Sequence, residues 1–203
     1  GGAGKDGVSE KEINLSVSVK LKDLLEQRGY RVVMTREKDV SLDSLNKSST
    51  SRHQRDLNAR VDIINGSGAQ LFVSIHVNSN SGRPSADGSI VFYSGNFDQN
   101  RKIACCIQRS LNGMAVNNKK RTVHDPLKAG FFILKKSKIP GVIIETAFIS
   151  NADERKLLSG DKFREQLAGA IADGIDQYMH DRHNRLLSSH PVFPNARLRK
   201  KSG

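Results

Sequence analysis

An α/β fold built on a mostly parallel sheet is predicted by two features of this 203-residue sequence. Short apolar runs alternate along the chain with longer segments in which apolar residues recur every three or four positions, which is the period of a helix. The runs in 71–76 (LFVSIH) and 142–146 (VIIET) are also mainly apolar rather than alternating, and this is typical of strands buried on both faces. We therefore expect one domain with a twisted sheet of about five to six strands flanked by helices.

The first elements follow a glycine-rich opening segment, residues 1–7 (GGAGKDG). A helix is expected to begin after Ser9, because Ser9 and Glu12 have the spacing of a capping box. Gly29 marks its end. Residues 31–36 (RVVMTR) are then expected to form a strand.

The middle of the chain continues the alternation of helices and strands. A long polar loop over 39–51 leads to a second helix, which ends near Gly66. The buried strand 71–76 follows, and after a Ser/Gly/Pro loop over 78–88 comes another strand, 89–94 (SIVFYS).

The C-terminal part begins with a helix that is expected to stop at Gly113. A short strand is expected over 130–134 (GFFIL), and the buried strand 142–146 follows. Asn151 has the character of a helix N-cap, and apolar residues recur at helical spacing over 163–178.

Beyond residue 179 this pattern stops. We therefore divide the chain into a domain of residues 1–179 and a basic tail of residues 180–203, which we expect to be poorly ordered.

The chain is strongly basic, with a formal net charge of +12. A basic surface suits a polyanion such as nucleic acid, an acidic membrane surface or an anionic wall polymer, and the alternative is solvated charge with no specific partner. Nucleic acid is not the expected partner, because no binding module is recognisable and only 5% of residues are aromatic. No apolar run approaches the roughly 20 residues of a membrane span, so no transmembrane segment is expected.

His76 is the first candidate for a functional residue, because it closes an apolar strand and polar residues follow at once. In open α/β sheets, ligands bind beyond the carboxyl ends of the strands. The position alone is equally compatible with a histidine that only hydrogen-bonds a loop.

Two glutamates stand at element ends that could converge on His76. Glu145 follows the apolar run 142–144, where a carboxylate is costly unless it is paired or bound to metal. A salt bridge or a capping role is the structural alternative. Glu10 lies in the first turn of the expected helix, where it is either a ligand or an acid favoured by the helix dipole. Glu12 has a role available in the capping box.

A set of Glu, His and a second Glu suggests zinc hydrolysis. Catalytic zinc typically has three protein ligands and a water, and a nearby carboxylate acts as general base. Two ligand candidates, Glu10 and His76, and one base candidate, Glu145, can be counted here. The other histidines do not fill the third place convincingly, and His124 is the best of them.

Three segments resemble the sequence blocks of zinc-dependent N-acetylmuramoyl-L-alanine amidases, bacterial peptidoglycan hydrolases of the autolysin and sporulation group. They are 9–15 (SEKEINL), 71–79 (LFVSIHVNS) and 142–151 (VIIETAFISN). The likeness covers residues 1 to about 179, in order and with suitable spacing. The segment 51–60 (SRHQRDLNAR) is most similar to the germination-specific, spore-cortex branch.

The resemblance implies a twisted sheet of about six strands, a zinc ion held by His, Glu and His, and cleavage of the amide between N-acetylmuramic acid and L-alanine of the stem peptide. Carried over by motif, Glu10 and His76 are zinc ligands and Glu145 is the catalytic glutamate. The family's first ligand is a His in a GHGG motif at the end of the first strand, and both are expected upstream of Gly1.

The resemblance also bears on partners and location. It implies peptidoglycan as the substrate, action outside the cytoplasm in the cell wall or spore envelope, and room for an activating protein partner. A catalytically inactive wall-binding or partner-binding relative is the alternative, because this sequence contains only two of the three expected ligands.

Overall fold

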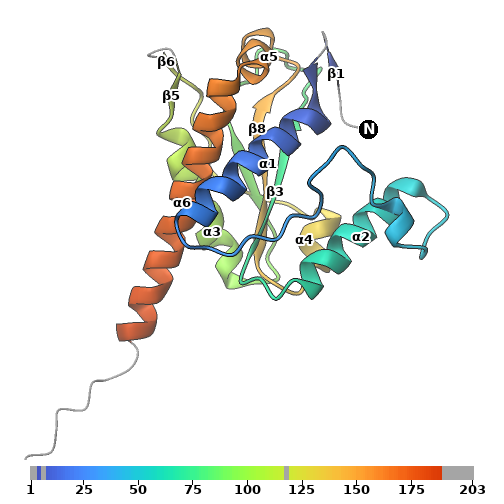
Figure 1. Cartoon of the computed structure of the whole chain (residues 1–203). Coiled ribbons are helices and arrows are strands. Elements are labelled where there is room, and N and C mark those ends of the chain that lie inside the picture. Colours follow the sequence, from blue (N-terminus) through green and yellow to red (C-terminus); the bar gives the residue numbers. More distant parts are fainter. Residues whose placement is uncertain (1–3, 6–7, 117–118, 189–203) are drawn as a thin grey trace, which may run out of the picture.

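A four-stranded mixed sheet forms the centre of the computed structural model, which describes residues 4–5, 8–116 and 119–188 (Figure 1). In sheet order its strands are β3 (Phe72–Asn78), β8 (Gly141–Phe148), β4 (Ile90–Tyr93) and β7 (Leu127–Lys128). β3 runs parallel to β8 and β4 parallel to β7, whereas β8 and β4 are antiparallel. The single-domain α/β fold is confirmed, although within the described residues the main sheet has fewer strands than expected.

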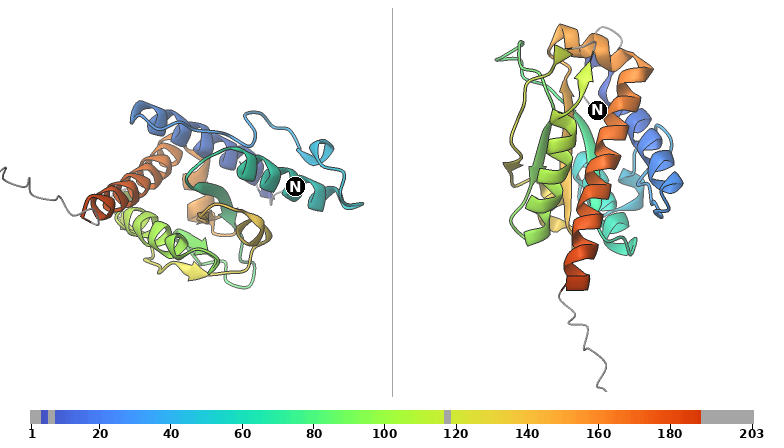
Figure 2. Two further views of the ribbon diagram at one scale, coloured as in Figure 1. Left: turned by 90° about the horizontal axis from the view of Figure 1, so that it is seen from below. Right: turned by 90° about the vertical axis from the view of Figure 1, so that its left-hand side faces the viewer.

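Helices cover both faces of this sheet (Figure 2). One face is covered by α1 (Glu10–Gln27), α3 (Asp98–Asn112) and α6 (Asp161–Ser188), and the other by α2 (Arg52–Gly66) and α4 (Phe132–Lys136). Alternate residues of β8 serve the two cores, since Val142 and Ile144 pack with the first group and Ile143 with the second. Burial on both faces explains why β8 is continuously apolar up to Glu145.

The remaining described elements are short. They are β1 (Gly4–Lys5), β2 (Val8–Ser9), η1 (Asp43–Leu45), β5 (Ala115–Val116), β6 (Lys119–Lys120) and α5 (Ala152–Ser159). No helix among the described residues is both long and apolar enough to cross a membrane.

The prediction of a capping box at the start of α1 is wrong. Ser9 is the N-cap residue, but its side chain makes no capping hydrogen bond with the described residues. Its backbone instead belongs to β2 and pairs with Gly4 of β1. Ser9 is therefore tied to β1 through its backbone, and its side chain does not cap α1.

The expected strand over 31–36 is irregular. A cavity of about 1010 Å³ lies between this segment and β3, and both line it. β3 is the edge strand of the described sheet, so no ladder partner reaches residues 31–36. The apolar pattern is therefore present without the neighbouring strand that it needs.

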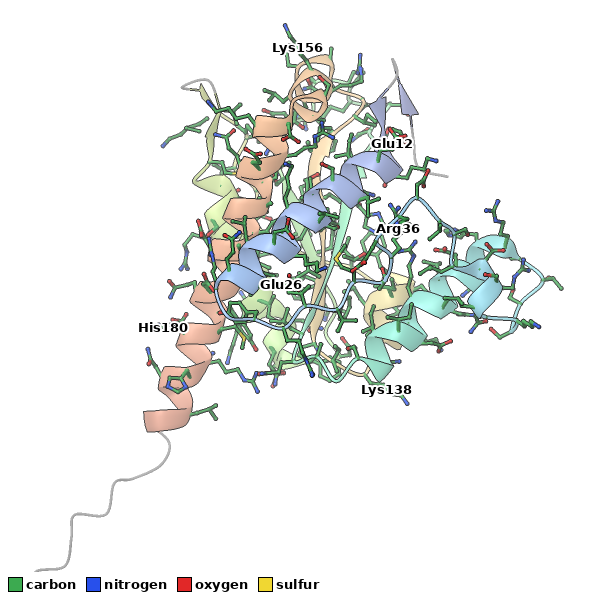
Figure 3. All side chains as sticks on the ribbon, viewed as in Figure 1. Glu12, Glu26, Arg36, Lys138, Lys156 and His180 are labelled. Carbon is green, nitrogen blue, oxygen red and sulfur yellow. The ribbon has the colours of Figure 1, made fainter. Side chains whose placement is uncertain are left out.

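Two further segments depart from expectation. Residues 132–136 form the helix α4 where a short strand was expected over 130–134, because a short apolar run does not distinguish a buried helical turn from a strand. α6 continues to Ser188 and so includes the first residues of the expected tail, among them His180, which Figure 3 labels. The rest of that tail, residues 189–203, lies outside the described residues.

Replacing Gly174 with alanine is expected to destabilise the protein. A Cβ at this position of α6 would lie 2.5 Å from Cα and 2.9 Å from the backbone nitrogen of Ile107 in α3. Backbone atoms cannot rotate away, so the two helices must separate, and overpacking of this kind costs about 1–3 kcal/mol. Urea denaturation measures the change.

Gly169 provides a control on the same helix, because an added Cβ there meets no described atom within 4 Å. Alanine at this position is expected to preserve or raise stability, since glycine is the poorer helix former. Equal losses for the two variants would contradict the close contact of α3 and α6.

Candidate active site

His76 and Glu145 lie side by side on adjacent parallel strands. They are direct partners in the register of β3 and β8. His76 is on the same face of β3 as Phe72, and Glu145 on the same face of β8 as Ile143, since side chains alternate along a strand. Phe72 and Ile143 belong to one apolar cluster, so the two polar side chains continue a shared row toward the carboxyl ends of the strands.

Glu10 joins them from the first residue of α1. Its Oε1 is 3.4 Å from Nδ1 of His76. Asn14, one turn along the helix, donates a hydrogen bond from Nδ2 to the same oxygen at 3.3 Å. The side chain of Glu10 is 15% exposed and that of His76 is 42% exposed, so the pair sits at the surface end of the core.

The imidazole of His76 is also held from its other side. Ser74 lies two residues earlier on the same face of β3, and its Oγ is 3.0 Å from Nε2 of His76. When Nδ1–H donates to Oε1 of Glu10, Nε2 accepts from the hydroxyl of Ser74, so the ring is held from both sides.

Glu145 is a buried carboxylate with spare hydrogen-bonding capacity. Its Oε2 is buried and has no hydrogen-bond partner within the described part of the chain. Burial raises the pKa of Glu145, the nearby Glu10 carboxylate raises it further, and His76 opposes the rise. A carboxylate of this kind accepts a proton more readily than an exposed one.

A large recess adjoins the pair formed by Glu10 and His76. The cavity of about 1010 Å³ beside β3 is lined by both residues, and basic side chains including Arg36 and His53 also reach it. Arg36, labelled in Figure 3, donates from Nη2 to the backbone oxygen of Lys11 at 2.6 Å and so ties the 31–36 segment to the start of α1. The cavity is large enough to admit part of a polymer.

The structure thus brings Glu10, His76 and Glu145 together and leaves the other histidine candidate elsewhere. His124 lies on a separate loop, and its Nε2 is 2.8 Å from the backbone oxygen of Asp87. No group of three or more His, Cys, Asp or Glu side chains arranged to hold a metal occurs among residues 4–5, 8–116 and 119–188. Those residues therefore supply two facing donors and a neighbouring carboxylate.

Sequence reasoning missed Ser74 and Asn14. Both carry a recognisable signal, because Ser74 precedes His76 by one strand period and Asn14 follows Glu10 by one helical turn. Residues at these spacings lie on the same face of a strand or helix. Ser74 and Asn14 are therefore natural candidates for residues that orient His76 and Glu10.

Comparisons with known proteins agree on one family. A family model described as N-acetylmuramoyl-L-alanine amidase matches residues 1–177. The germination-specific N-acetylmuramoyl-L-alanine amidase of Bacillus subtilis (strain 168) is 34% identical over 185 residues, which is 90% of this chain and 76% of that protein.

Solved structures give the same result. The CwlD amidase from Clostridioides difficile, in complex with the GerS lipoprotein, has a TM-score of 0.78 and 35% identity, covering 89% of this chain and 92% of that one. The amidase AmiC2 of Nostoc punctiforme has a TM-score of 0.72 and 29% identity, covering 89% of both chains. Sequence and fold similarity therefore extend over nearly the whole described domain.

Proposed function

Because this chain belongs to the N-acetylmuramoyl-L-alanine amidase family, we propose that it hydrolyses the amide between N-acetylmuramic acid and L-alanine of the peptidoglycan stem peptide through His76, Glu10 and Glu145. One observation carries the assignment of residues. His76 and Glu145 are register partners on β3 and β8, and Glu10 approaches His76 to 3.4 Å from the start of α1.

The donor set supports zinc as the cofactor. Imidazole nitrogen and carboxylate oxygen are both common zinc ligands. Nδ1 of His76 lies 3.4 Å from Oε1 of Glu10, so one donor atom of each kind faces the other. These two residues would hold the ion together with the further His that the resemblance implies.

Zinc, when bound, supplies a Lewis acid that polarises the scissile carbonyl and lowers the pKa of an attacking water. Glu145 accepts the proton of that water through its buried carboxylate and passes it to the leaving amine of L-alanine. The C–N bond breaks, leaving a carboxylate on the muramic acid and a free amine on the peptide. Ser74 holds the His76 ring, and Asn14 holds Glu10, so neither side chain has to reorganise during the reaction.

The relatives suggest where this reaction takes place. We propose a role in spore germination, because one similar amidase is named germination-specific. Such a role places the protein outside the cytoplasm, in the cell wall or spore envelope. The solved CwlD amidase is in complex with the GerS lipoprotein, so we further propose that a protein partner assists this chain.

Digestion of purified peptidoglycan by the full-length protein tests the assignment. An amidase releases peptides with new N-terminal alanine and creates no new reducing sugar ends. His76→Ala is expected to abolish alanine release and to lower zinc affinity. Loss of a residue that only orients a ligand costs roughly 10- to 100-fold in affinity, and loss of the ligand itself is expected to cost more. His124→Ala is the control, because its ring binds a backbone oxygen away from this site. Parent-level release by His76→Ala would refute its assignment as a ligand.

The alternative is a relative that binds the wall without cleaving it, which the two-donor set among the described residues motivates. It predicts sedimentation with peptidoglycan, no stoichiometric zinc in the full-length protein and no new N-terminal alanine. Stoichiometric zinc together with alanine release excludes it.

A further inference from the structure

β8 contains a bulge immediately after Glu145. Between the register pairs His76–Glu145 and Asn78–Phe148, β3 advances two residues while β8 advances three. A bulge takes backbone groups out of the regular ladder and redirects the neighbouring side chains, and it is frequent beside active sites. The geometry of Glu145 relative to His76 therefore depends on what holds this bulge.

Thr146 ties the bulge to β3. It is fully buried, with 0% exposure. Its Oγ1 donates a hydrogen bond of 2.9 Å to the backbone oxygen of His76. A single hydroxyl, on the residue directly after Glu145, thus contacts the peptide unit of His76.

The backbone oxygen of Thr146 is held from the opposite direction. It accepts from Nη2 of Arg121 at 2.9 Å and from Oγ of Ser89 at 2.7 Å. Nη1 of Arg121 also donates to Oγ of Ser89 at 2.9 Å, which closes a small ring of hydrogen bonds around this oxygen.

Glu154 in turn fixes Arg121. Its Oε1 accepts from Nε of Arg121 at 2.7 Å and from the backbone nitrogen of Gly88 at 3.0 Å, and its Oε2 accepts from the backbone nitrogen of Phe148 at 2.6 Å. The side chains of Arg121 and Glu154 are 9% and 3% exposed. The guanidinium of Arg121 also lies 5.2 Å from the ring centre of Phe163. Burial on this scale leaves the ion pair little freedom to move.

We propose that Thr146 is a positioning residue for amide hydrolysis, and that its hydroxyl, with Arg121 at its backbone oxygen, sets the spacing of His76 and Glu145. This inference rests on the proposed roles of those two residues. Valine at position 146 has a similar shape but leaves the oxygen of His76 without this donor, so the bulge is free to shift. A displacement of about 1 Å in an active site can lower the rate roughly 100-fold.

Two variants of the full-length protein test the proposal, with kcat and KM measured on peptidoglycan at saturating zinc. Thr146→Val is expected to lower kcat roughly 10- to 100-fold with little change in KM, and Thr146→Ser, which keeps the hydroxyl, to restore most of kcat. In the metal-free proteins, the imidazole NMR signals of His76 are expected to move in the Val variant and to stay near the parent positions in the Ser variant.

Ser137→Ala is the matched control. Ser137 is 5% exposed and its hydroxyl donates to the backbone oxygen of Ile133 at 2.7 Å, beside α4. Its loss is expected to lower the melting temperature but to leave kcat and the His76 signals unchanged. Parent-like kcat in Thr146→Val, or an equal loss of kcat in the Val and Ser variants, would overturn the positioning role. Glu145→Gln, assayed in parallel, tests the proposed function separately. Activity in the Glu145→Gln variant would indicate that the proposed function is wrong, whereas the outcomes for Thr146 concern only the positioning role.

Discussion

Replacing Glu145 with glutamine is expected to lower kcat on peptidoglycan by roughly 100- to 10,000-fold, which is the usual contribution of a general acid–base residue. Glutamine keeps the shape of the side chain but cannot take a proton from water. The buried Oε2, with no hydrogen-bond partner among the described residues, is the atom proposed to accept that proton. Release of N-terminal alanine over time, with zinc content measured in the same samples, gives the change.

The same substitution is expected to leave the protein folded. Burial raises the pKa of Glu145, so the ionised side chain is an unfavourable feature of the folded state that glutamine removes. Loss of unfolding free energy above about 1 kcal/mol is not expected. Glu12→Gln is the control, because Glu12 is exposed on the first turn of α1, where Figure 3 labels it. Parent-level kcat in Glu145→Gln would refute the assignment of the base.

Two of the three proposed site residues stand out in the sequence for a physical reason, whereas Glu10 is assigned by the family resemblance. His76 and Glu145 are polar side chains at the ends of runs that burial otherwise keeps apolar, and such exceptions are costly unless the side chain is hydrogen-bonded, paired or bound to metal. The sequence does not predict that the side chains of His76 and Glu145 lie side by side on one face of the sheet. Strand register depends on how β3 and β8 pair, and a shift of one residue would place one side chain on the opposite face.

In the segments that depart from expectation, the outcome depends on tertiary partners, and the local sequence pattern does not show whether those partners are present. Residues 31–36 have strand character, but they line a cavity, and no strand of the described sheet pairs with them. Ser9 has the residue type of an N-cap, but its side chain makes no capping hydrogen bond with the described residues, and its backbone pairs with Gly4. In both cases tertiary context overrides a correct local preference.

Glu154 illustrates the same limit at the site. From sequence it belongs to a helix start, and Asn151 indeed caps α5 by accepting from the backbone nitrogens of Asp153 and Glu154. The carboxylate of Glu154 instead reaches Arg121, which is 33 residues away in the chain. No local spacing indicates this pairing, and it is the one that secures the bulge next to Glu145.

Glu154→Gln is accordingly expected to lower the free energy of unfolding by about 3–5 kcal/mol, the usual effect of breaking a buried ion pair. Burial raises the pKa of Glu154, while Arg121 and the backbone N–H groups of Gly88 and Phe148 oppose the rise. The charged forms of Glu154 and Arg121 therefore stabilise each other in the buried site. Glutamine at position 154 leaves the guanidinium of Arg121 without its counter-charge. Urea unfolding followed by circular dichroism measures the loss.

Two comparisons separate the charge effect from simple loss of a contact. Asp173→Asn weakens the pair of Arg28 with Asp173, whose side chain is 63% exposed, and is expected to change stability little. The double replacement of Arg121 by methionine and Glu154 by leucine removes both charges and is expected to recover part of the loss. It still leaves the oxygen of Thr146 without Arg121, so kcat should remain low after stability improves. A Glu154→Gln effect as small as that of Asp173→Asn would contradict a structural role for the buried pair.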